Sequence, residues 1–562
     1  MGGIRLSNTL AEVKRHGKHY TPTDLARFLA ERVLAQLVGQ TSIRVLDPAC
    51  GDGELLFAIH ELVTERFPRS QVTLVGYDID SAAVAVARTR AEAQGVVADW
   101  HQGDFLQAAR ELPKGSFDAV ITNPPYVRTQ QLGQAAAQTL AAEFGLTGRI
   151  DLTHPFVALL PSLLRPDGVV GLLCSNRFLT TKAGANVRSV LQTSLQPVEL
   201  YDLGDTRLFG AAVLPAIVVA LNDARGARSE CAFTSAYEDT DSDVVGENGL
   251  YQALVASSDS VVSHGGRVIA VKAGTLFHSV VPTDPWRRSH KAGDDWLHSV
   301  QAATWRTFGD IAKIRVGIKT TADAVFISER WDEIEPRPES GLLLPLITHD
   351  NVTRWRITDL ATRVLYPYDL SKSKRTLMNM AEYPGAMSYL ETHSKRLKGR
   401  QYVTDGGRAW YEIWVPQQPA LWSVPKIVFP DISVRARFAL DRSGAVVNGD
   451  CYWISLDDIG DDGLVHLMLA VANSSLGVRY YDEVCGNKLY SGRRRWMTQY
   501  VSKLPLPDPR TPAATRLIAA TKDLMGSKRV CDAEEMSLMD GLVEAAFSKP
   551  VSKGCAVAET LF

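Results

Sequence analysis

The chain has 562 residues, of which 45% are hydrophobic, and a formal net charge of -2, so it is long enough for two or more domains with substantial cores. The balanced charge decides nothing about nucleic acid, because a basic face can be hidden in a neutral total. No apolar run approaches the ~20 residues of a membrane span, residues 1–20 hold no apolar signal core, and the seven cysteines form no CxxC pair. We therefore expect a cytoplasmic protein with no membrane partner, no disulfide framework and no structural zinc site.

Strand-like and helical patterns alternate through residues 1–225, as they do in a parallel sheet with crossover helices. Apolar residues recur at helical spacing over 23–38 and 54–66. The predicted strands are Ile43–Leu46, Val72–Tyr77, Phe117–Thr122, Val169–Cys174, Val198–Leu203 and Leu214–Leu221. The pattern predicts an α/β domain over this part of the chain.

The rest of the chain has three different characters. Residues 226–305 are polar with weak periodicity, which predicts a connecting region. Residues 306–510 combine short strands with turns, and most of the tryptophans lie beyond residue 280, which suggests a separate recognition domain. Residues 511–562 are expected to form a helical tail, to which no role is assigned.

A glycine-rich, acidic loop, DPACGDG at 47–53, follows the first predicted strand and opens a helix. Such a turn lets backbone approach a ligand closely at the carboxyl edge of a doubly wound sheet. The loop lacks GxGxxG, however, and its carboxylates Asp47, Asp52 and Glu54 would repel a pyrophosphate. It therefore favours a cationic or neutral cofactor.

Further motifs follow the later strands: YDID at 77–80, GDF at 103–105 and NPPY at 123–126. Each has an ordinary explanation when taken alone. Asp78 could cap a helix, the GDF and NPPY segments could be turns that stop a strand, and Cys50 in the first loop could be a small core residue. Their order at successive strand ends makes coincidence a poor explanation.

The series YTP at 20–22, DPACGDG, YDID, GDF and NPPY resembles the S-adenosylmethionine-dependent amino-methyltransferases, specifically the gamma-type DNA adenine-N6 methyltransferases of restriction–modification systems. The resemblance continues in GRIDL at 148–152, SNRF at 175–178 and LF at 208–209, and it is weaker in the second half of the chain. It implies a Rossmann-like class I methyltransferase domain with a mixed, largely parallel sheet, followed by a separate α+β target-recognition domain. One departure is Asp47, where relatives often have Glu.

The resemblance also implies which residues form each site. Residues 20–22 would line the methionine end of S-adenosylmethionine, the loop 47–53 would surround it, Asp78 would bind its ribose, and residues 104–105 would hold its adenine. The implied cofactor-binding residues are Tyr20, Thr21, Pro22, Asp47, Pro48, Ala49, Cys50, Gly51, Gly53, Asp78, Ile79, Asp104, Phe105 and Asn123. The implied catalytic residues are Asn123, Pro124, Pro125, Tyr126 and Phe209, with the two aromatic rings on either side of an extruded base.

The NPPY segment suits transfer to an exocyclic amine, whose lone pair is delocalised into the base ring. The Asn123 side-chain oxygen and the Pro124 carbonyl would accept its hydrogens, favour the pyramidal nitrogen and stabilise the positive charge that develops. The prolines hold these acceptors still because their φ is fixed. Tyr126 would offer a stacking face to a flipped base. No metal site is predicted, since the sulfonium supplies the reactivity and the sequence offers no ligand cluster.

Three basic stretches in the second half predict contacts with double-stranded DNA, because Lys and Arg neutralise phosphates and Arg can read guanine. A solvated charged face is the alternative for each stretch. The predicted DNA-binding residues are Lys395, Arg396, Lys398, Arg400, Arg435, Arg437, Arg493, Arg494 and Arg495.

The predicted function is a site-specific, adenine-specific DNA methyltransferase, the modification component of a restriction–modification or related defence system. Methylation of RNA or of protein glutamine by the same NPPY chemistry is one alternative, and a non-catalytic DNA-binding subunit is another. The chain shows no obvious nuclease constellation, so a cognate restriction endonuclease or defence complex would be a separate partner.

Overall fold

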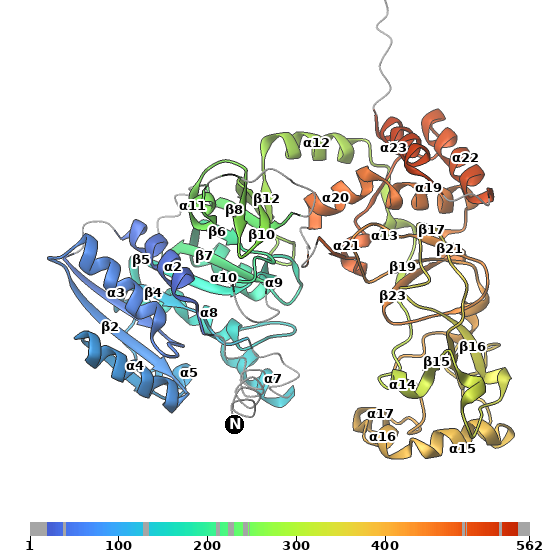
Figure 1. Ribbon diagram of the computed structural model, residues 1–562, viewed down its shortest axis with the longest axis horizontal. Helices are drawn as coiled ribbons and strands as arrows, with labels where there is room; N and C mark the ends of the chain where they lie inside the picture. The colour runs from blue at the N-terminus through green and yellow to red at the C-terminus, as the bar shows by residue number, and fades with distance from the viewer. Residues whose placement is uncertain are drawn as a thin grey trace, which may run out of the picture. The chain divides into compact units, whose positions relative to one another are not determined.

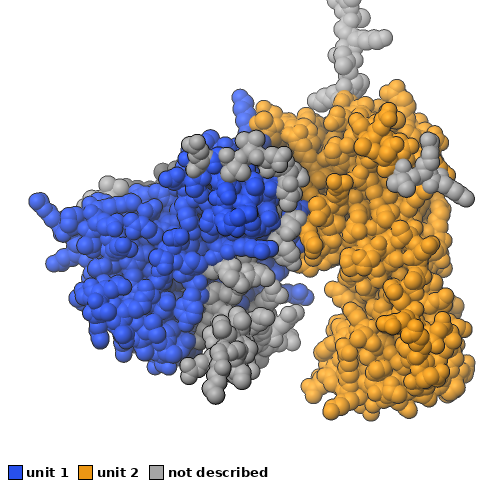
Figure 2. Space-filling view, viewed as in Figure 1, with its two compact units in different colours: residues 1–291, 484–492 blue, residues 292–483, 493–562 orange. Residues whose placement is uncertain are grey.

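The computed structural model describes residues 20–37, 41–126, 134–208, 214–222, 230–239, 246, 248–485, 489, 492–527 and 531–548. The chain forms two compact units, coloured separately in Figure 2: residues 1–291 with 484–492, and residues 292–483 with 493–562. Within the described ranges, every helix is too short or too polar to cross a membrane.

A twelve-stranded sheet runs through the first unit (Figure 1). Its strands are β1 Ser42–Asp47, β2 Gln71–Asp78, β3 Ala98–Gln102, β4 Phe117–Thr122, β5 Leu164–Ser175, β6 Gln196–Asp202, β7 Pro215–Leu221, β8 Ala232–Glu238, β9 Ser260–His264, β10 Arg267–Lys272, β11 Thr275–Phe277 and β12 Arg287–Ser289. Their order is β12-β11-β8-β6-β7-β5-β4-β1-β2-β3, with β10 paired to β8 and β9. The pairs from β3 through β5 are parallel, whereas β7 is antiparallel to both of its neighbours. This mixed sheet, parallel throughout from β3 to β5, confirms the predicted Rossmann-like fold class.

Helices cover both faces of this sheet, because its central strands bury alternate residues on opposite sides. On β5, Val169 and Leu173 face one apolar cluster, whereas Val170 and Leu172 face the other. The first cluster includes residues of α2 Thr23–Gln36, α3 Glu54–Arg66, α4 Ser81–Gln94 and α11 Leu250–Val255. The second includes residues of α5 Phe105–Ala108, α8 Thr153–Leu163, α9 Arg177–Thr180 and α10 Ala185–Thr193. One further helix, α7 Gln134–Glu143, precedes α8.

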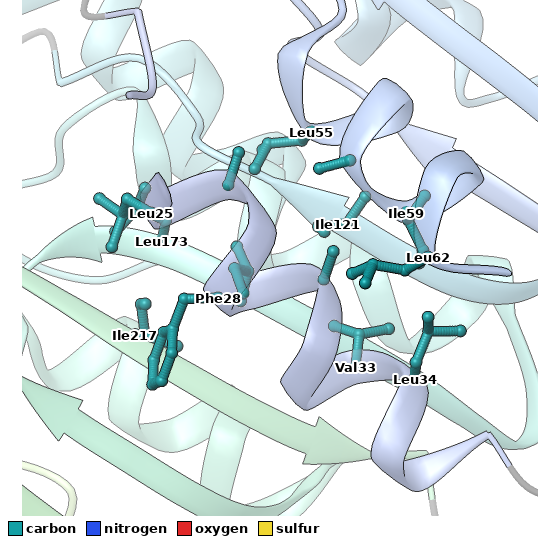
Figure 3. Close-up of a cluster of buried hydrophobic side chains, with 14 of the residues drawn as sticks. Leu25, Phe28, Val33, Leu34, Leu55, Ile59, Leu62, Ile121, Leu173 and Ile217 are labelled. Atoms are coloured by element: carbon teal, nitrogen blue, oxygen red, sulfur yellow. The ribbon is translucent and has the colours of Figure 1, made fainter. Parts of the chain in front are cut away.

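The helix α2 packs beside α3 on one face of the sheet, in the first cluster, and Figure 3 shows Phe28 and Val33 of α2 among residues of α3, β4, β5 and β7. Gly171 on β5 permits this approach, since a Cβ there would lie 2.4 Å from the Val33 side chain. Thr21 and Pro22 stand immediately before α2. Packing of α2 therefore carries these N-terminal residues to the sheet.

The segment expected to connect two domains contributes β8–β12 to this same sheet. Its strands are short or polar, and β12 buries none of its three residues. Edge strands that are solvated on one side lack the continuous apolar run that marks central strands. Their polar composition explains why the periodicity looked weak.

The second unit combines small sheets with helices. Its strands are β13 Arg306–Thr307, β14 Ile314–Val316, β15 Ile327–Ser328, β16 Leu343–Ile347, β17 Trp355–Arg356, β18 Arg363–Leu365, β19 Lys426–Pro430, β20 Ile432–Ser433, β21 Ala439–Asp441, β22 Val446–Val447, β23 Cys451–Ser455, β24 Arg494–Arg495 and β25 Pro505–Leu506. Its helices are α12 Lys291–Ala302, which begins at the boundary between the units, α13 Phe308–Ile311, α14 Asp323–Phe326, α15 Pro384–Thr392, α16 Ser394–Lys398, α17 Gln401–Asp405, α18 Leu456–Ile459, α19 Asp462–Asn473, α20 Ser475–Cys485, α21 Thr498–Val501, α22 Pro512–Gly526 and α23 Ala533–Phe547. The larger sheets have the orders β14-β23-β19-β21-β17 and β15-β18-β16-β22.

Tryptophans build the core of this unit. Trp331, Trp422 and Trp453 are buried in one apolar cluster, and Trp422 packs against Trp453 with ring centroids 5.1 Å apart. Trp496 is also buried. The density of tryptophan beyond residue 280 therefore reflects packing at these positions, and does not by itself indicate a recognition surface.

Two helices, α22 and α23, account for the described part of the predicted tail (Figure 1). α22 packs against α19 and α23, with Ala514, Leu517 and Thr521 buried. The tail is thus integrated in the second unit.

Candidate active site

The strand-end motifs of the first unit meet at one edge of the sheet, because β1, β2 and β4 are neighbouring parallel strands. The loop after β1 is tied to the end of β2: Cys50 N–H donates to the Tyr77 carbonyl at 2.8 Å, and Gly51 N–H donates to Asp78 Oδ2 at 2.8 Å. Two motifs that are far apart in the sequence therefore form one structure.

Asp78 uses both of its oxygens to fix this structure. Its Oδ1 accepts from Asp80 N–H at 2.8 Å. The helix cap is Asp80 and not Asp78, since the Asp80 side chain accepts from Ala82 N–H at the start of α4. Ile79, between them, is 69% exposed. The acid at the end of β2 is half-buried and held in place at the edge where a cofactor is expected.

Asp47, the last residue of β1, is buried, with 1% of its surface exposed. Burial raises the pKa of its carboxyl to about 7, and the hydrogen bond from Ala49 N–H only partly opposes this effect. The negative charge of Asp78 also raises the pKa of Asp47. A positive charge near this loop would favour the ionised form.

The backbone of the 47–53 loop is open at Gly51. Gly51 and Gly53 have φ of +53° and +86°, which L side chains rarely adopt. A Cβ on Gly51 would meet nothing nearer than the Tyr20 ring at 3.9 Å, whereas one on Gly53 would collide with Phe57 and Trp100. Gly53 is needed for packing and Gly51 leaves space beside Tyr20, which is 54% exposed.

The remaining predicted loop residues have structural roles as well. Cys50 is buried, and burial raises the pKa of its thiol, as expected of a small core residue. Pro48 lies in the turn between Asp47 and Cys50, and Pro22 is the N-cap residue of α2. Pro22 and Pro48 would contribute to a ligand site by setting the course of the backbone around it.

Asp104 caps α5 by accepting from Leu106 N–H at 2.9 Å. The Phe105 ring is 2% exposed and packs against Tyr77 and Phe156. The implied contact of Phe105 with the cofactor adenine cannot use the face of this ring, because the ring belongs to the core. The backbone of Phe105 and the Asp104 carboxylate remain the candidate contacts.

The NPPY segment follows β4, and its side chains are hydrogen-bonded. Asn123 Nδ2 donates to Thr21 Oγ1 at 3.1 Å, and the Tyr126 hydroxyl donates to Asn123 Oδ1 at 2.5 Å. The same hydroxyl lies 3.4 Å from the Leu173 carbonyl. Burial raises the pKa of the Tyr126 phenol, so the hydroxyl keeps its proton. Asn123 is thus connected to β5 and to the residues before α2.

The two prolines are fixed from one side. Pro124 is buried, and the Pro125 carbonyl accepts from the Thr153 hydroxyl of α8 at 3.1 Å. In the described part of the chain, no group donates to the Pro124 carbonyl. Phe209, the other aromatic predicted to flank a base, lies outside the described residues.

The predicted DNA-binding residues of the second unit differ sharply in their surroundings. Arg400 is buried, with 6% exposed, and donates to the carbonyls of Leu397, Thr320, Trp410 and Glu412. A guanidinium in this position cannot reach a phosphate while the turn is folded. The prediction for Arg400 is therefore wrong in its physical basis, and the residue has a structural role.

Arg494 and Arg495 are also engaged. Arg494 binds Asp482 through two nitrogens at 2.7 Å each, and Arg495 binds Asp431 at 3.2 Å. The other predicted residues keep basic side chains at or near the surface: Lys395, Arg396, Lys398, Arg435, Arg437 and Arg493. Among the described residues, none of these six has an acidic partner within ion-pair distance.

Two site residues were missed or only partly understood from the sequence. Thr153 follows the GRIDL motif, but nothing in the sequence indicated its bond to Pro125. Thr21 was predicted only to face a cofactor, whereas its hydroxyl binds Asn123. A contact across 102 residues leaves no local pattern.

The strand order and the loops at the carboxyl edge define a class I methyltransferase fold. The family described as Eco57I restriction-modification methylase matches residues 73–209. The type II methyltransferase M.BanIII of Aneurinibacillus aneurinilyticus is 35% identical over 551 residues, covering 93% of this chain and 95% of that protein. The type IIL restriction-modification enzyme MmeI, solved in complex with DNA, is 13% identical and shares the fold over 94% of this chain and 73% of its own, with a TM-score of 0.57.

The chain belongs to the type II methyltransferases of restriction–modification systems. The predicted resemblance to restriction–modification methyltransferases is therefore confirmed, and with it DNA methylation as the function and S-adenosylmethionine as the methyl donor. A more distant relative, release factor glutamine methyltransferase of Moorella thermoacetica, is 32% identical over 157 residues, which cover only 27% of this chain and 52% of that protein.

Proposed function

We propose that the protein methylates the N6 amine of adenine at a specific double-stranded DNA sequence, with Asn123 and Pro124 as the acceptors that bind the amine. The observation that carries this proposal is the arrangement at the end of β4. Asn123 Oδ1 and the Pro124 carbonyl are consecutive acceptors, and the Pro124 carbonyl accepts from no group in the described ranges.

The residues at the adjoining strand ends fit S-adenosylmethionine. Its sulfonium supplies an electrophilic methyl group. Asp47, Asp78 and Asp104 place carboxylates at three successive strand ends, which suits a cationic ligand with ribose hydroxyls. The absence of a Cβ at Gly51 lets a ligand approach the backbone beside Tyr20. We assign the cofactor to this edge, with Ile79, Ala49, Thr21 and Pro22 around it.

The acceptors would act on the amine and not on the cofactor. An amine whose two hydrogens are held by oxygens becomes pyramidal, and its lone pair is freed from the ring for attack on the methyl group. The positive charge that develops on nitrogen is stabilised by the same two dipoles, which are already oriented before the reaction. An adenine in a duplex must first be extruded, and we assign Tyr126 and Phe209 as its stacking partners.

We further propose that the second unit reads the DNA target through its accessible basic side chains. Lys395, Arg396 and Lys398 lie on α16, and Arg435, Arg437 and Arg493 lie beside the β20–β24 pair. Cations without ion-pair partners have no salt bridge to lose when they meet a phosphate, although Lys398 also lies over the Trp410 ring, 5.4 Å from its centroid. Arg494 and Arg495 would have to give up their ion pairs with carboxylates before they could bind a phosphate. We therefore expect them to contribute less to DNA affinity.

Two features favour adenine in DNA over the alternatives. The gamma-type order, with the cofactor loop before NPPY and the recognition region last, is that of adenine-N6 methyltransferases. The glutamine methyltransferase relative matches only 27% of the chain and leaves the rest without a counterpart. A cognate restriction endonuclease encoded separately would complete the system.

The identity of the methylated base can be measured directly. DNA from cells lacking the protein is incubated with the purified protein and S-adenosylmethionine carrying a deuterated methyl group, then digested to nucleosides for mass spectrometry. We expect labelled N6-methyladenine. Labelled N4-methylcytosine, or label only in RNA or protein offered in the same reaction, would contradict the proposal.

A further inference from the structure

The NPPY segment has an unusual need for support from elsewhere in the fold. Proline has no N–H, so Pro124 and Pro125 cannot be fixed by donating backbone hydrogen bonds. Their positions can be secured only by packing and by groups that donate to their carbonyls. The structure supplies one such donor, the Thr153 hydroxyl, 3.1 Å from the Pro125 carbonyl.

Thr153 is itself held firmly. It is 5% exposed, and its N–H donates to Asp151 Oδ1 at 3.0 Å in the first turn of α8. The His154 N–H also donates to the Asp151 carbonyl, at 3.2 Å. The hydroxyl that meets Pro125 therefore projects from a fixed helix start.

The Asn123 side chain has a second need, which is orientation. The two ends of a carboxamide have almost the same shape, but only the oxygen can accept hydrogens from an amine. Thr21 Oγ1 accepts from Nδ2 at 3.1 Å, which leaves the oxygen on the other side, where it accepts from Tyr126. Loss of the Thr21 hydroxyl would remove an acceptor that favours this orientation of the amide over the flipped one.

We propose that Thr21 and Thr153 are positioning residues that hold the two amine acceptors from opposite sides, Thr21 by orienting the Asn123 amide and Thr153 by anchoring the backbone after Pro124. Neither threonine touches the target base. They act by keeping Asn123 Oδ1 and the Pro124 carbonyl at the spacing that an amine with two hydrogens requires. This inference rests on the proposed function of Asn123.

Paired substitutions test the inference, because valine keeps the shape of threonine without its hydroxyl, whereas serine keeps the hydroxyl. Single-turnover methyl transfer at saturating DNA and cofactor is measured for Thr21→Val, Thr21→Ser, Thr153→Val and Thr153→Ser. Since a misplacement of ~1 Å can cost ~100-fold in rate, we expect each valine variant to lose roughly 10- to 100-fold. Each serine variant should recover most of that loss.

Cofactor affinity and melting temperature separate positioning from other roles. For Thr153→Val we expect the dissociation constant for S-adenosylmethionine to stay within about twofold of the wild-type value. Thr21 lies in the proposed cofactor site, so for Thr21→Val the rate at saturating cofactor, and not the affinity, tests the positioning role. A valine variant with the wild-type rate would overturn the role of that threonine. So would a serine variant that melts like wild type and yet stays as slow as the valine variant. For Thr21, weaker cofactor binding with an unchanged rate at saturation would assign the hydroxyl to the cofactor alone.

The Asn123→Ala variant distinguishes a failure of the positioning role of the threonines from a failure of the proposed role of Asn123. If Asn123→Ala is inactive and the valine variants are as fast as wild type, only the present inference fails. If Asn123→Ala retains the wild-type rate, the proposed role of Asn123 fails, and this inference fails with it.

Discussion

The NPPY segment of the first unit and the basic segment 395–400 of the second unit were both predicted from short runs of sequence, yet the structure treats them differently. Residues 123–126 act together, since Asn123, Pro125 and Tyr126 are joined to three separate parts of the fold. Residues 395–400 have different surroundings, because Lys398 is exposed while Arg400 is buried among carbonyls.

The difference follows from backbone geometry. Residues that follow parallel strands are delivered to one edge of the sheet whatever their separation in sequence, so motifs there converge. Residues on a short helix or turn point in several directions, and neighbours in sequence can lie on opposite sides. Leu397, Arg400 and Val403 are buried at three-residue intervals, while the residues between them are exposed. A charge run therefore predicts a surface only for those members that point outward.

The largest effect is expected at Asn123. Asn123→Ala removes one of the two acceptors, and by analogy with the loss of a preorganised oxyanion donor we expect a decrease of about 100- to 1,000-fold in the rate of methyl transfer. The cofactor should still bind, because Asn123 acts on the amine. A tritiated-methyl assay measures the first quantity and calorimetry the second. A parallel loss of cofactor affinity would mean that the two sites at this edge are not separable.

The second effect concerns stability and contrasts two neighbours in the basic segment. Arg400→Met leaves the Trp410 and Glu412 carbonyls without the donor that they have in the wild-type protein, at ~1–3 kcal/mol each, so we expect a loss of roughly 2–6 kcal/mol in the free energy of unfolding. Lys398→Met is the matched control. It removes only the contact of the Lys398 ammonium with the Trp410 ring, so stability should stay within about 1 kcal/mol of the wild-type value. Denaturant unfolding measures both.

In DNA binding the order of the two effects should be reversed: Lys398→Met should change the salt dependence of the affinity more than Arg400→Met does. Removal of one phosphate contact lowers the slope of log affinity against log salt by about 1, so Lys398→Met should reduce this slope. Arg400→Met, under conditions where it is folded, should leave the slope unchanged. A reduced slope for Arg400→Met with wild-type stability would place Arg400 at the DNA and overturn its assignment to the core.

The smallest effect is a pH dependence at Asp47. Its folded pKa of about 7 lies above its ordinary value of 3.8, so the folded protein binds more protons between these values. The free energy of unfolding of the ligand-free protein should therefore fall as the pH rises through this window. A cationic cofactor favours the ionised carboxyl, so its affinity should increase with pH by up to about tenfold per unit below pH 7.

Calorimetry in buffers of different ionisation enthalpy measures the protons released on binding. We expect release near pH 6.5 for the wild-type protein and a smaller release for Asp47→Asn, whose side chain does not titrate. Equal release by the two proteins would show that Asp47 is not coupled to the cofactor.

Much of the first unit could be predicted from its sequence, and the exceptions have physical causes. The apolar strands from Ile43 to Leu221 were found because central strands are buried on both faces. Strand β3 was missed because only Trp100 is buried in its five residues. The strands β8–β12 were missed for the same reason, because strands near a sheet edge carry polar residues and lack a continuous apolar run.

The site was predictable in its motifs but not in its supports. Strand ends carry Asp47, Asp78 and Asn123 to one place, and the sequence order revealed this. The hydroxyls of Thr21 and Thr153 reach the NPPY segment only because α2 and α8 pack beside β4 and β5, and no local pattern encodes that packing.

The most direct test of the account is a map of modified bases by long-read sequencing of DNA from cells expressing the wild-type protein or Asn123→Ala. The account predicts modified adenine at one position of one recurring sequence with the wild-type protein, and none above background with Asn123→Ala. Modified cytosine, modified adenine without a recurring sequence, or the same pattern from Asn123→Ala would contradict it.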